Sequence, residues 1–331
     1  MENIARLSSQ QRAELFSETA AIRAMTPAIV EKDFWVTWLL GRLFNDEVLK
    51  NLLMFKGGTS LSKAYGLIER FSEDVDLVLN WHALTAGAPM AERSKTQQAQ
   101  LNKKMTAAAE HYIAGELLTR MNEVVGDVCR CELDDVDRDV INLYYPAAFA
   151  DDYLRPEVRL EIGPLASWLP NQRAQICSYA AEAFPDLFDS THCAVQVIQA
   201  ERTFWEKATI LHVETYRPDD RPLPPRYFRH YYDLAQMACT DVKTRALAAD
   251  ELLADVVTFK QRFYPRGWAH YELAVRGTLR LVPAGNVLAA VAADYRAMRD
   301  MIFGEVPTFE QIMQSLQLLE DEINRKEVHD E

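Results

Sequence analysis

Two aspartates separated by a single residue, Asp74 and Asp76, lie in an apolar run that ends at Leu79. Side chains alternate between the two faces of a strand, so a strand here would place both carboxylates on one face, with Val75 and Leu77 in a core. Two adjacent carboxylates repel each other unless a cation neutralises them. Mg²⁺ and Mn²⁺ take oxygen ligands of this kind, and Mg²⁺ commonly binds substrate phosphates as well. The DxD pattern therefore predicts a site for Mg²⁺ or Mn²⁺ on a strand.

A glycine-rich turn, Gly57-Gly58-Thr59-Ser60, follows another apolar run. Because glycine has no Cβ, the chain can turn tightly here and bring backbone N–H groups close to a phosphate. The two hydroxyls add donors, and Thr59 is expected to cap a helix over residues 60–68. Alone, GGTS is more typical of a turn and DxD of a solvated loop. In this order, on apolar strands, they predict a nucleoside-triphosphate and metal site, although not a Walker P-loop, because no GKS or GKT follows.

A further strand is predicted over residues 155–163, with Glu161 on its polar face. If this strand lies beside the one that carries the DxD pattern, Glu161 becomes a third carboxylate for the metal; a plain acid on an edge strand is the alternative. Two alternating segments, 128–133 and 140–145, predict a pair of strands around an acidic turn. Turn chemistry explains those acids better than a metal loop does.

Lys207 lies among apolar neighbours in the predicted helix ERTFWEKATILH. A compact cation there could reach a phosphate, and a surface lysine is the alternative. Further along, residues 217–232 form the most basic and aromatic stretch of the chain. Its arginines are candidate RNA ligands: Arg217, Arg221, Arg226 and Arg229. Basic residues beside aromatic ones can contact phosphates and stack bases, whereas the competing interpretation is a solvated loop followed by an aromatic core helix.

The predicted elements divide the chain into two domains. A helix begins at Thr26-Pro27, with a capping threonine and a proline at the first helical position. Its Glu31-Lys32-Asp33 run is expected on a solvated face. No strand is predicted after residue 165, so we expect an α/β domain over residues 1–164. A mainly helical domain over residues 165–331 would complete the active-site cleft.

The composition is that of an ordinary globular protein, with 331 residues, 49% of them hydrophobic. The net charge of −13 has the wrong sign for a protein whose whole surface binds nucleic acid, so an RNA partner would need a local basic patch. The acid excess would equally suit a basic protein partner. No apolar run approaches a membrane span, the N-terminus does not resemble a secretion signal, and the five cysteines include no CxxC pair. These features predict a cytoplasmic protein with reduced thiols and no membrane partner.

Five blocks of sequence resemble the AbiEii/AbiGii toxins, a family of nucleotidyltransferases from bacterial abortive-infection and toxin–antitoxin systems. The blocks are VEKDFWVTWLL, FKGGTSLSKAY, RFSEDVDL, FWEKATILH and RHYYDL, and they occur in the order of the family. The first two are the most specific, since the glycine turn and DxD alone indicate only the polymerase-β-like superfamily. The resemblance covers most of the chain. It implies an α/β (α+β) fold, with a polymerase-β-like mixed sheet and a helical C-terminal domain.

The resemblance also implies roles for individual residues. Gly58 and Thr59 match the pair that holds the triphosphate, and Asp74 and Asp76 match the metal-binding pair. Lys207 matches a lysine that contacts the nucleotide phosphates.

The last motif, RHYYDL, supplies Asp233 as its acidic residue, but it has His230 where acidic residues are common in the family. Glu161 corresponds to the third carboxylate of the superfamily. Either Glu161 or Asp233 would complete the metal shell or act as the base.

The activity that the resemblance implies is transfer of nucleotides from an NTP to an RNA 3′ end. The metal ions would orient the triphosphate and activate the attacking hydroxyl. tRNA is the expected acceptor, and a cognate antitoxin is the expected protein partner in phage defence. Two alternatives stay open at this point: nucleotidyl or phosphoryl transfer to a protein hydroxyl, and a non-catalytic nucleotide sensor.

Overall fold

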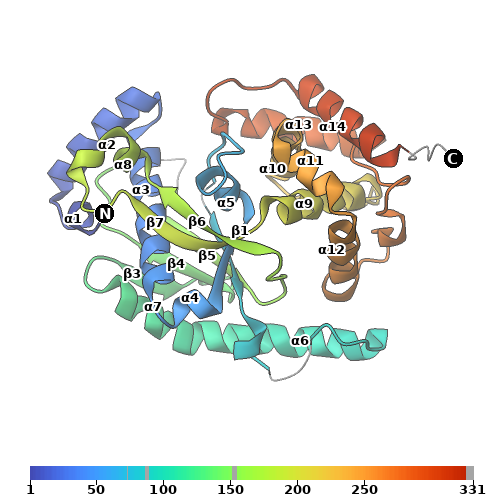
Figure 1. Cartoon of the computed structure of the whole chain (residues 1–331), viewed down its shortest axis with the longest axis horizontal. Helices are drawn as coiled ribbons and strands as arrows, with labels where there is room; N and C mark the ends of the chain where they lie inside the picture. Colours follow the sequence, from blue (N-terminus) through green and yellow to red (C-terminus); the bar gives the residue numbers. More distant parts are fainter. Residues whose placement is uncertain (73, 86–88, 151–154, 326–331) are drawn as a thin grey trace. The chain divides into compact units, whose positions relative to one another are not determined.

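A computed structural model describes residues 1–72, 74–85, 89–150 and 155–325. It divides the chain into two compact units (Figure 1). The first comprises Met1–Tyr65 and Phe71–Ile198, and the second comprises Gly66–Arg70 and the chain from Gln199 onward. Among the described residues, no helix combines the length and apolar character needed to cross a bilayer.

A mixed sheet of seven strands, in the order β3-β4-β5-β2-β1-β7-β6, forms the centre of the first unit. β2 pairs with β5 in parallel and with β1 antiparallel, and β1 pairs with β7 in parallel. β3, β4 and β5 form an antiparallel run, as do β6 and β7. The strands are β1 Leu53–Lys56, β2 Asp74–Leu79, β3 Arg130–Leu133, β4 Val140–Tyr144, β5 Glu157–Gly163, β6 Asn171–Cys177 and β7 His192–Ile198. The α/β fold with a mixed sheet is therefore confirmed, as are the predicted strands around the acidic turn.

The expectation of no strand after residue 165 was wrong, because β6 and β7 both lie beyond it. β7 places Val195 and Val197 in the core beside β1, and its seven residues alternate between buried and less buried positions, a period-two signal that the sequence analysis missed. β6, with the sequence NQRAQIC, is an edge strand whose exposed residues break the apolar alternation that reveals a strand in a sequence. The domain boundary consequently lies after Ile198, and the predicted boundary after residue 164 falls inside the first unit.

Helices pack on this sheet, among them α3, which contacts β5 and β7 (Figure 1). As predicted, α3 begins after Thr26, whose hydroxyl accepts a hydrogen bond from the Ile29 amide, with Pro27 as its first residue. The helices of this unit are α1 Glu2–Ala5, α2 Ser9–Arg23, α3 Pro27–Asn45, α4 Leu49–Leu52, α5 Gly57–Lys63, α6 Lys95–Tyr112, α7 Leu118–Val125 and α8 Tyr179–Ala183. A π-helical turn, Ile113–Leu117, joins α6 to α7.

The charged run near the start of α3 is buried, so its expected place on a solvated face was wrong. Glu31, Lys32 and Asp33 are 0%, 1% and 6% exposed. The Glu31 carboxylate accepts hydrogen bonds from the amides of Ala148 and Phe149, which lie more than 100 residues away. Such distant partners leave no local signal in the sequence.

Asp33 forms a buried ion pair with Lys63, the last residue of α5, with 2.6 Å between Oδ1 and Nζ. Its second carboxylate oxygen accepts a hydrogen bond from the Tyr179 amide. Removing one partner from a buried pair leaves the other charge uncompensated. The pair therefore ties α3 to α5, the helix that contains the glycine-rich turn.

The second unit is mainly helical, as predicted for the C-terminal part of the chain. Its central helix, α9, packs against α10, α11 and α12, and α10 also contacts α14. The helices are α9 Ala200–Thr215, α10 Arg229–Ala238, α11 Asp241–Ala248, α12 Asp250–Phe263, α13 Gly285–Met298 and α14 Phe309–Asn324 (Figure 1). The short segment Gly66–Arg70 joins this unit through an isolated bridge between Arg70 and Ile302 and a hydrogen bond from the Phe303 amide to the Glu69 carbonyl.

Candidate active site

The polar face of β2 carries both aspartates of the DxD pattern. Val75 and Leu77, between and after them, are 0% and 2% exposed and face the core. In the parallel pairing with β5, Asp76 lies opposite Glu161. The adjacency on which the role of Glu161 depended is therefore present, and three carboxylates lie on one polar face of two neighbouring strands.

Glu161 shares the polar face of β5 with Arg159, which lies opposite Asp74. The Arg159 guanidinium is 3.6 Å from the Glu161 carboxylate and 2.8 Å from that of Asp134. Asp134 also accepts hydrogen bonds from the amides of Asp137 and Val136 and from the side chain of Asn142. These bonds, the Asp137 amide first, hold its pKa well below the usual range. The acidic turn is thus built by turn chemistry, as the sequence favoured.

Gly57 lies directly against Asp76. Its backbone has a φ of +77°, and a Cβ atom on Gly57 would lie 1.8 Å from Oδ2 of Asp76. A glycine is therefore required twice over, by the backbone conformation and by the approach of the carboxylate. This contact joins the glycine-rich turn to the DxD strand.

The two hydroxyls of the turn donate to main-chain carbonyls. Thr59 donates to the Asp74 carbonyl, and Ser60 donates to that of Gly57. The expected cap by Thr59 on a helix over residues 60–68 was wrong, because α5 begins at Gly57 and ends at Lys63. A hydroxyl has a single proton, so in this arrangement the two side chains fix the turn and the start of β2.

Replacing Gly57 by alanine should lower activity by roughly 10²-fold or more, because the new methyl group must displace the Asp76 carboxylate. Gly126→Ala is the matched control: Gly126 has a φ of +62°, and a Cβ atom there would meet nothing within 4 Å. Both variants carry the backbone strain of a positive φ, but only the first moves Asp76. Nucleotide transfer and thermal unfolding should be measured on both. Equal activity of the two variants would contradict the role of this contact.

The donors on this face fit a hard divalent cation. Among the described residues, no group of three or more histidine, cysteine, aspartate or glutamate side chains is arranged to enclose a metal. Mg²⁺, however, is usually bound through one or two carboxylates together with substrate phosphates. The close approach of Asp76 to Gly57 leaves its carboxylate beside the backbone that the sequence assigns to the phosphates.

In the second unit, Asp233 is bound by two cations. Arg70 donates to both carboxylate oxygens, at 2.6 and 2.8 Å, and Nζ of Lys207 is 2.8 Å from Oδ2. The side chains of Asp233 and Lys207 are 0% and 7% exposed, which excludes a surface lysine. Although burial alone would raise the pKa of Asp233, the two cations hold it well below its usual range. A carboxylate so bound is a poor base, and it positions Lys207.

Arg70 was missed as a functional candidate by the sequence analysis, although it is the first residue of the RFSEDVDL block. It belongs to the segment that joins the glycine-rich turn to the DxD strand, and that segment packs in the second unit. The hydroxyl of Tyr232 accepts a hydrogen bond from the Glu69 amide beside it. The only signal in the sequence was an arginine close to two acids, which equally describes a local ion pair.

A further cation lies near the Asp233–Lys207 pair, because Arg229 acts electrostatically on Lys207 and on His230. Burial, followed by repulsion from the neighbouring cations, lowers the pKa of His230 well below its usual range. His230 is therefore neutral at pH 7, and its Nδ1 is buried with no hydrogen-bond partner among the residues that the structure describes.

This depressed pKa predicts a pH dependence of stability. The unfolded chain binds a proton at His230 below about pH 6.5, and the folded chain does not, so the free energy of unfolding should fall as the pH drops. The slope from this group is about 1.4 kcal/mol per pH unit, down to the folded pKa. His230→Gln should remove that part of the slope in denaturant titrations at several pH values. His82→Gln, at an exposed histidine, should leave it unchanged.

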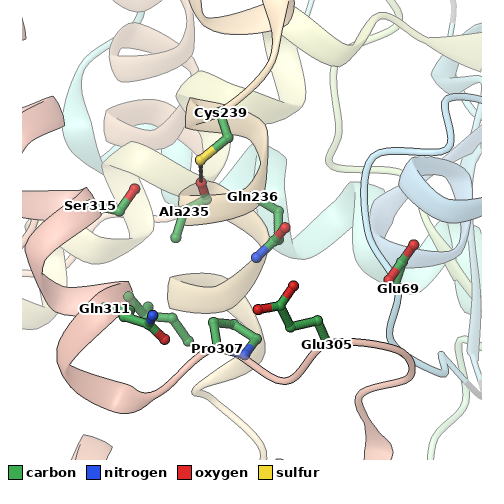
Figure 2. A pocket seen from close by; sticks show the side chains of 9 residues that line it. Glu69, Ala235, Gln236, Cys239, Glu305, Pro307, Gln311 and Ser315 are labelled. Carbon is green, nitrogen blue, oxygen red and sulfur yellow. Dashed lines mark hydrogen bonds between the residues drawn. The ribbon is translucent and has the colours of Figure 1, made fainter.

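A pocket of about 460 Å³ in the second unit does not fit phosphates (Figure 2). It is lined by Glu69, Ala235, Gln236, Cys239, Glu305, Pro307, Gln311, Ile312 and Ser315. Its charged side chains are the carboxylates of Glu69 and Glu305, which would repel a triphosphate. The cations around Asp233 are the better candidates.

The aromatic residues expected to stack bases are largely core residues. Phe228, Tyr231 and Tyr232 are 1%, 0% and 2% exposed, so the aromatic core helix, the competing interpretation, describes α10 better. Of the four predicted RNA-binding arginines, Arg221 and Arg226 are exposed, whereas Arg217 and Arg229 are half-buried.

Comparisons with known proteins identify the family of the chain. Residues 38–315 match the model of the family described as nucleotidyl transferase AbiEii toxin, type IV TA system. No curated protein matches the sequence. Among solved structures, the chain is similar in fold to MenT4, a nucleotidyltransferase toxin from Mycobacterium tuberculosis H37Rv, with 16% identity and a TM-score of 0.52 over 96% of this chain and 90% of that one. The family match covers well over half of the residues and includes the glycine-rich turn, both aspartates, Lys207 and Asp233. The chain therefore belongs to the AbiEii family of nucleotidyltransferase toxins of type IV toxin–antitoxin systems, and its enzymatic class is nucleotidyltransferase.

Proposed function

We propose that the enzyme transfers nucleotides from an NTP to the 3′ end of an RNA, with tRNA as the expected acceptor. In this proposal it is the toxin of a phage-defence system, acts in the cytoplasm on that RNA, and is countered by a cognate antitoxin protein. The observation that carries the proposal is the buried ammonium of Lys207, which lies 2.8 Å from Oδ2 of Asp233 and is 7% exposed. A compact cation of this kind can bind a phosphate oxygen, and a triphosphate supplies such oxygens.

The acidic face of the first unit supplies the complementary requirement. Asp74 and Asp76 would hold Mg²⁺ or Mn²⁺, with Glu161 as the third carboxylate. The metal would supply Lewis-acid stabilisation of phosphate charge and a lower pKa for the attacking hydroxyl. The amides of Gly57 and Gly58 are the proposed phosphate donors on this side, since the Thr59 and Ser60 hydroxyls donate to main-chain carbonyls.

The reaction is an in-line displacement. The acceptor hydroxyl oxygen forms a bond to the α-phosphorus, and the bond from that phosphorus to its bridging oxygen breaks. Pyrophosphate leaves with the electron pair, and Lys207 stabilises the charge that develops on it. Glu161 is the better candidate to accept the hydroxyl proton, because it is partly exposed, whereas Asp233 is buried between two cations.

The test is incubation of the purified chain with total RNA, Mg²⁺ and each labelled NTP in turn. Label in a small RNA would support the proposal and name the nucleotide. Label in protein would favour transfer to a protein hydroxyl instead. Nucleotide binding without transfer to any acceptor would favour a nucleotide sensor. Repeating the assay with the co-expressed antitoxin partner would test whether the partner suppresses transfer.

A further inference from the structure

Three arginines surround the ring of Trp268 in the second unit. The guanidinium carbons of Arg217, Arg266 and Arg221 lie 5.2, 5.4 and 6.0 Å from the ring centroid. An aromatic ring attracts a cation over its face, but three cations around one ring also repel each other. These four residues are called the Trp268 cluster below.

A single carboxylate compensates the cluster. The Glu214 side chain, 0% exposed, accepts two hydrogen bonds from Arg217. In the part of the chain that the structure describes, neither Arg221 nor Arg266 forms a side-chain ion pair or hydrogen bond, and both are exposed. Two positive charges therefore stand together without a counter-charge on a protein whose net charge is −13.

The side chains of the cluster are held in position by the residues around them. Its arginines come from two segments, one after α9 and one after α12, and a buried glutamate and a tryptophan ring fix their positions. The indole Nε1 of Trp268 is buried with no hydrogen-bond partner among the described residues. The acids in the same loop, Asp219 and Asp220, lie beyond ion-pair distance of both free arginines, and Asp219 accepts a hydrogen bond from Asn286.

The cluster is also placed near Lys207 along α9. Glu214, which anchors Arg217, follows Lys207 by seven residues, so the two side chains lie on the same face of the helix about two turns, or roughly 10 Å, apart. A strand whose end reacts near Lys207 would reach the cluster within a few nucleotides.

We infer that the Trp268 cluster binds the phosphates of the RNA acceptor near its reacting 3′ end. This inference rests on the proposed transfer to RNA. Guanidinium groups bind phosphate oxygens in a bidentate manner, and their planes also stack on unpaired bases. The cluster is the local basic patch that an acidic protein needs in order to bind RNA. We propose it as the RNA contact in place of the aromatic residues of α10, which are buried.

The test is RNA binding by the full chain carrying Arg221→Glu and Arg266→Glu together. Arg173→Glu with Arg296→Glu is the matched control, because these arginines are also exposed and lie outside the cluster. Dissociation constants for a bulk tRNA fraction should be measured without nucleotide at several salt concentrations. The cluster variant should bind at least tenfold more weakly than the control, and the salt slope should fall by about two. NTP binding and thermal unfolding should match the wild type, and Arg221→Gln with Arg266→Gln should show a smaller loss of RNA affinity.

Each outcome decides the inference separately from the proposed activity. RNA affinity equal to that of the control variant would overturn it, as would a wild-type chain that does not bind tRNA at all. Unchanged RNA affinity with weaker binding of the co-expressed antitoxin would overturn it in favour of an acidic protein partner. If the wild type bound tRNA through the cluster but labelled no RNA, the result would contradict the proposed transfer and support the binding site.

Discussion

Replacing Asp76 by asparagine should reduce nucleotide transfer by roughly 10³-fold or more while the chain stays folded. Asparagine keeps the shape of aspartate but removes the negative charge, and a metal that stabilises developing phosphate charge contributes several kcal/mol, of which about 4 kcal/mol correspond to that factor. The fold should persist because the neighbouring Val75 and Leu77 point into the core and are unchanged. The measurement is the rate of label transfer, with circular dichroism as the check on folding.

Asp135→Asn is the matched control for this variant. Asp135 is an exposed acid in the turn between β3 and β4, so the change in net charge is the same and no predicted ligand is lost. If Asp76 is a metal ligand, Asp76→Asn should also need a higher concentration of Mg²⁺ or Mn²⁺ than the wild type to reach its half-maximal rate. Full activity of Asp76→Asn at low metal would exclude Asp76 as a ligand.

The elements that the sequence predicted well are those with local signals. Thr26 and Pro27 start α3 because a cap and a fixed φ act within one turn. The alternation around Asp74 and Asp76 gave β2, since a strand with one buried face shows period two. The pairing of β2 with β5 could be stated only as a condition: Glu161 joins the two aspartates if its strand lies beside theirs, and in the structure it does.

The parts that the sequence did not reveal depend on partners far along the chain. Nothing local distinguishes the Glu31-Lys32-Asp33 run from a solvated face, because its burial requires the amides of Ala148 and Phe149 and the ammonium of Lys63. The Arg70–Asp233 pair spans 163 residues in the same way. Charged residues are buried only where partners compensate them, and the partners are a property of the fold.

Replacing Asp233 by asparagine should destabilise the second unit by about 3–5 kcal/mol, because it leaves buried cations without their carboxylate. Arg70 and Lys207 have side-chain exposures of 5% and 7%, so water screens them little. Lys207→Met should cost less stability, since Asp233 keeps both hydrogen bonds from Arg70. Activity should fall strongly in both variants: Asp233→Asn loses the group that positions Lys207, and Lys207→Met loses the cation itself.

The double variant, Asp233→Asn with Lys207→Met, separates positioning from direct participation. It removes one buried cation together with the carboxylate, so its free energy of unfolding should exceed that of Asp233→Asn alone. Its transfer rate should stay as low as that of Lys207→Met, because Asp233 has no role left once the lysine is gone. Denaturant unfolding and label transfer on the four proteins complete the cycle. If Asp233→Asn had the same free energy of unfolding as the wild type but transferred no label, the carboxylate would instead contact the nucleotide or its metal, as the sequence allowed.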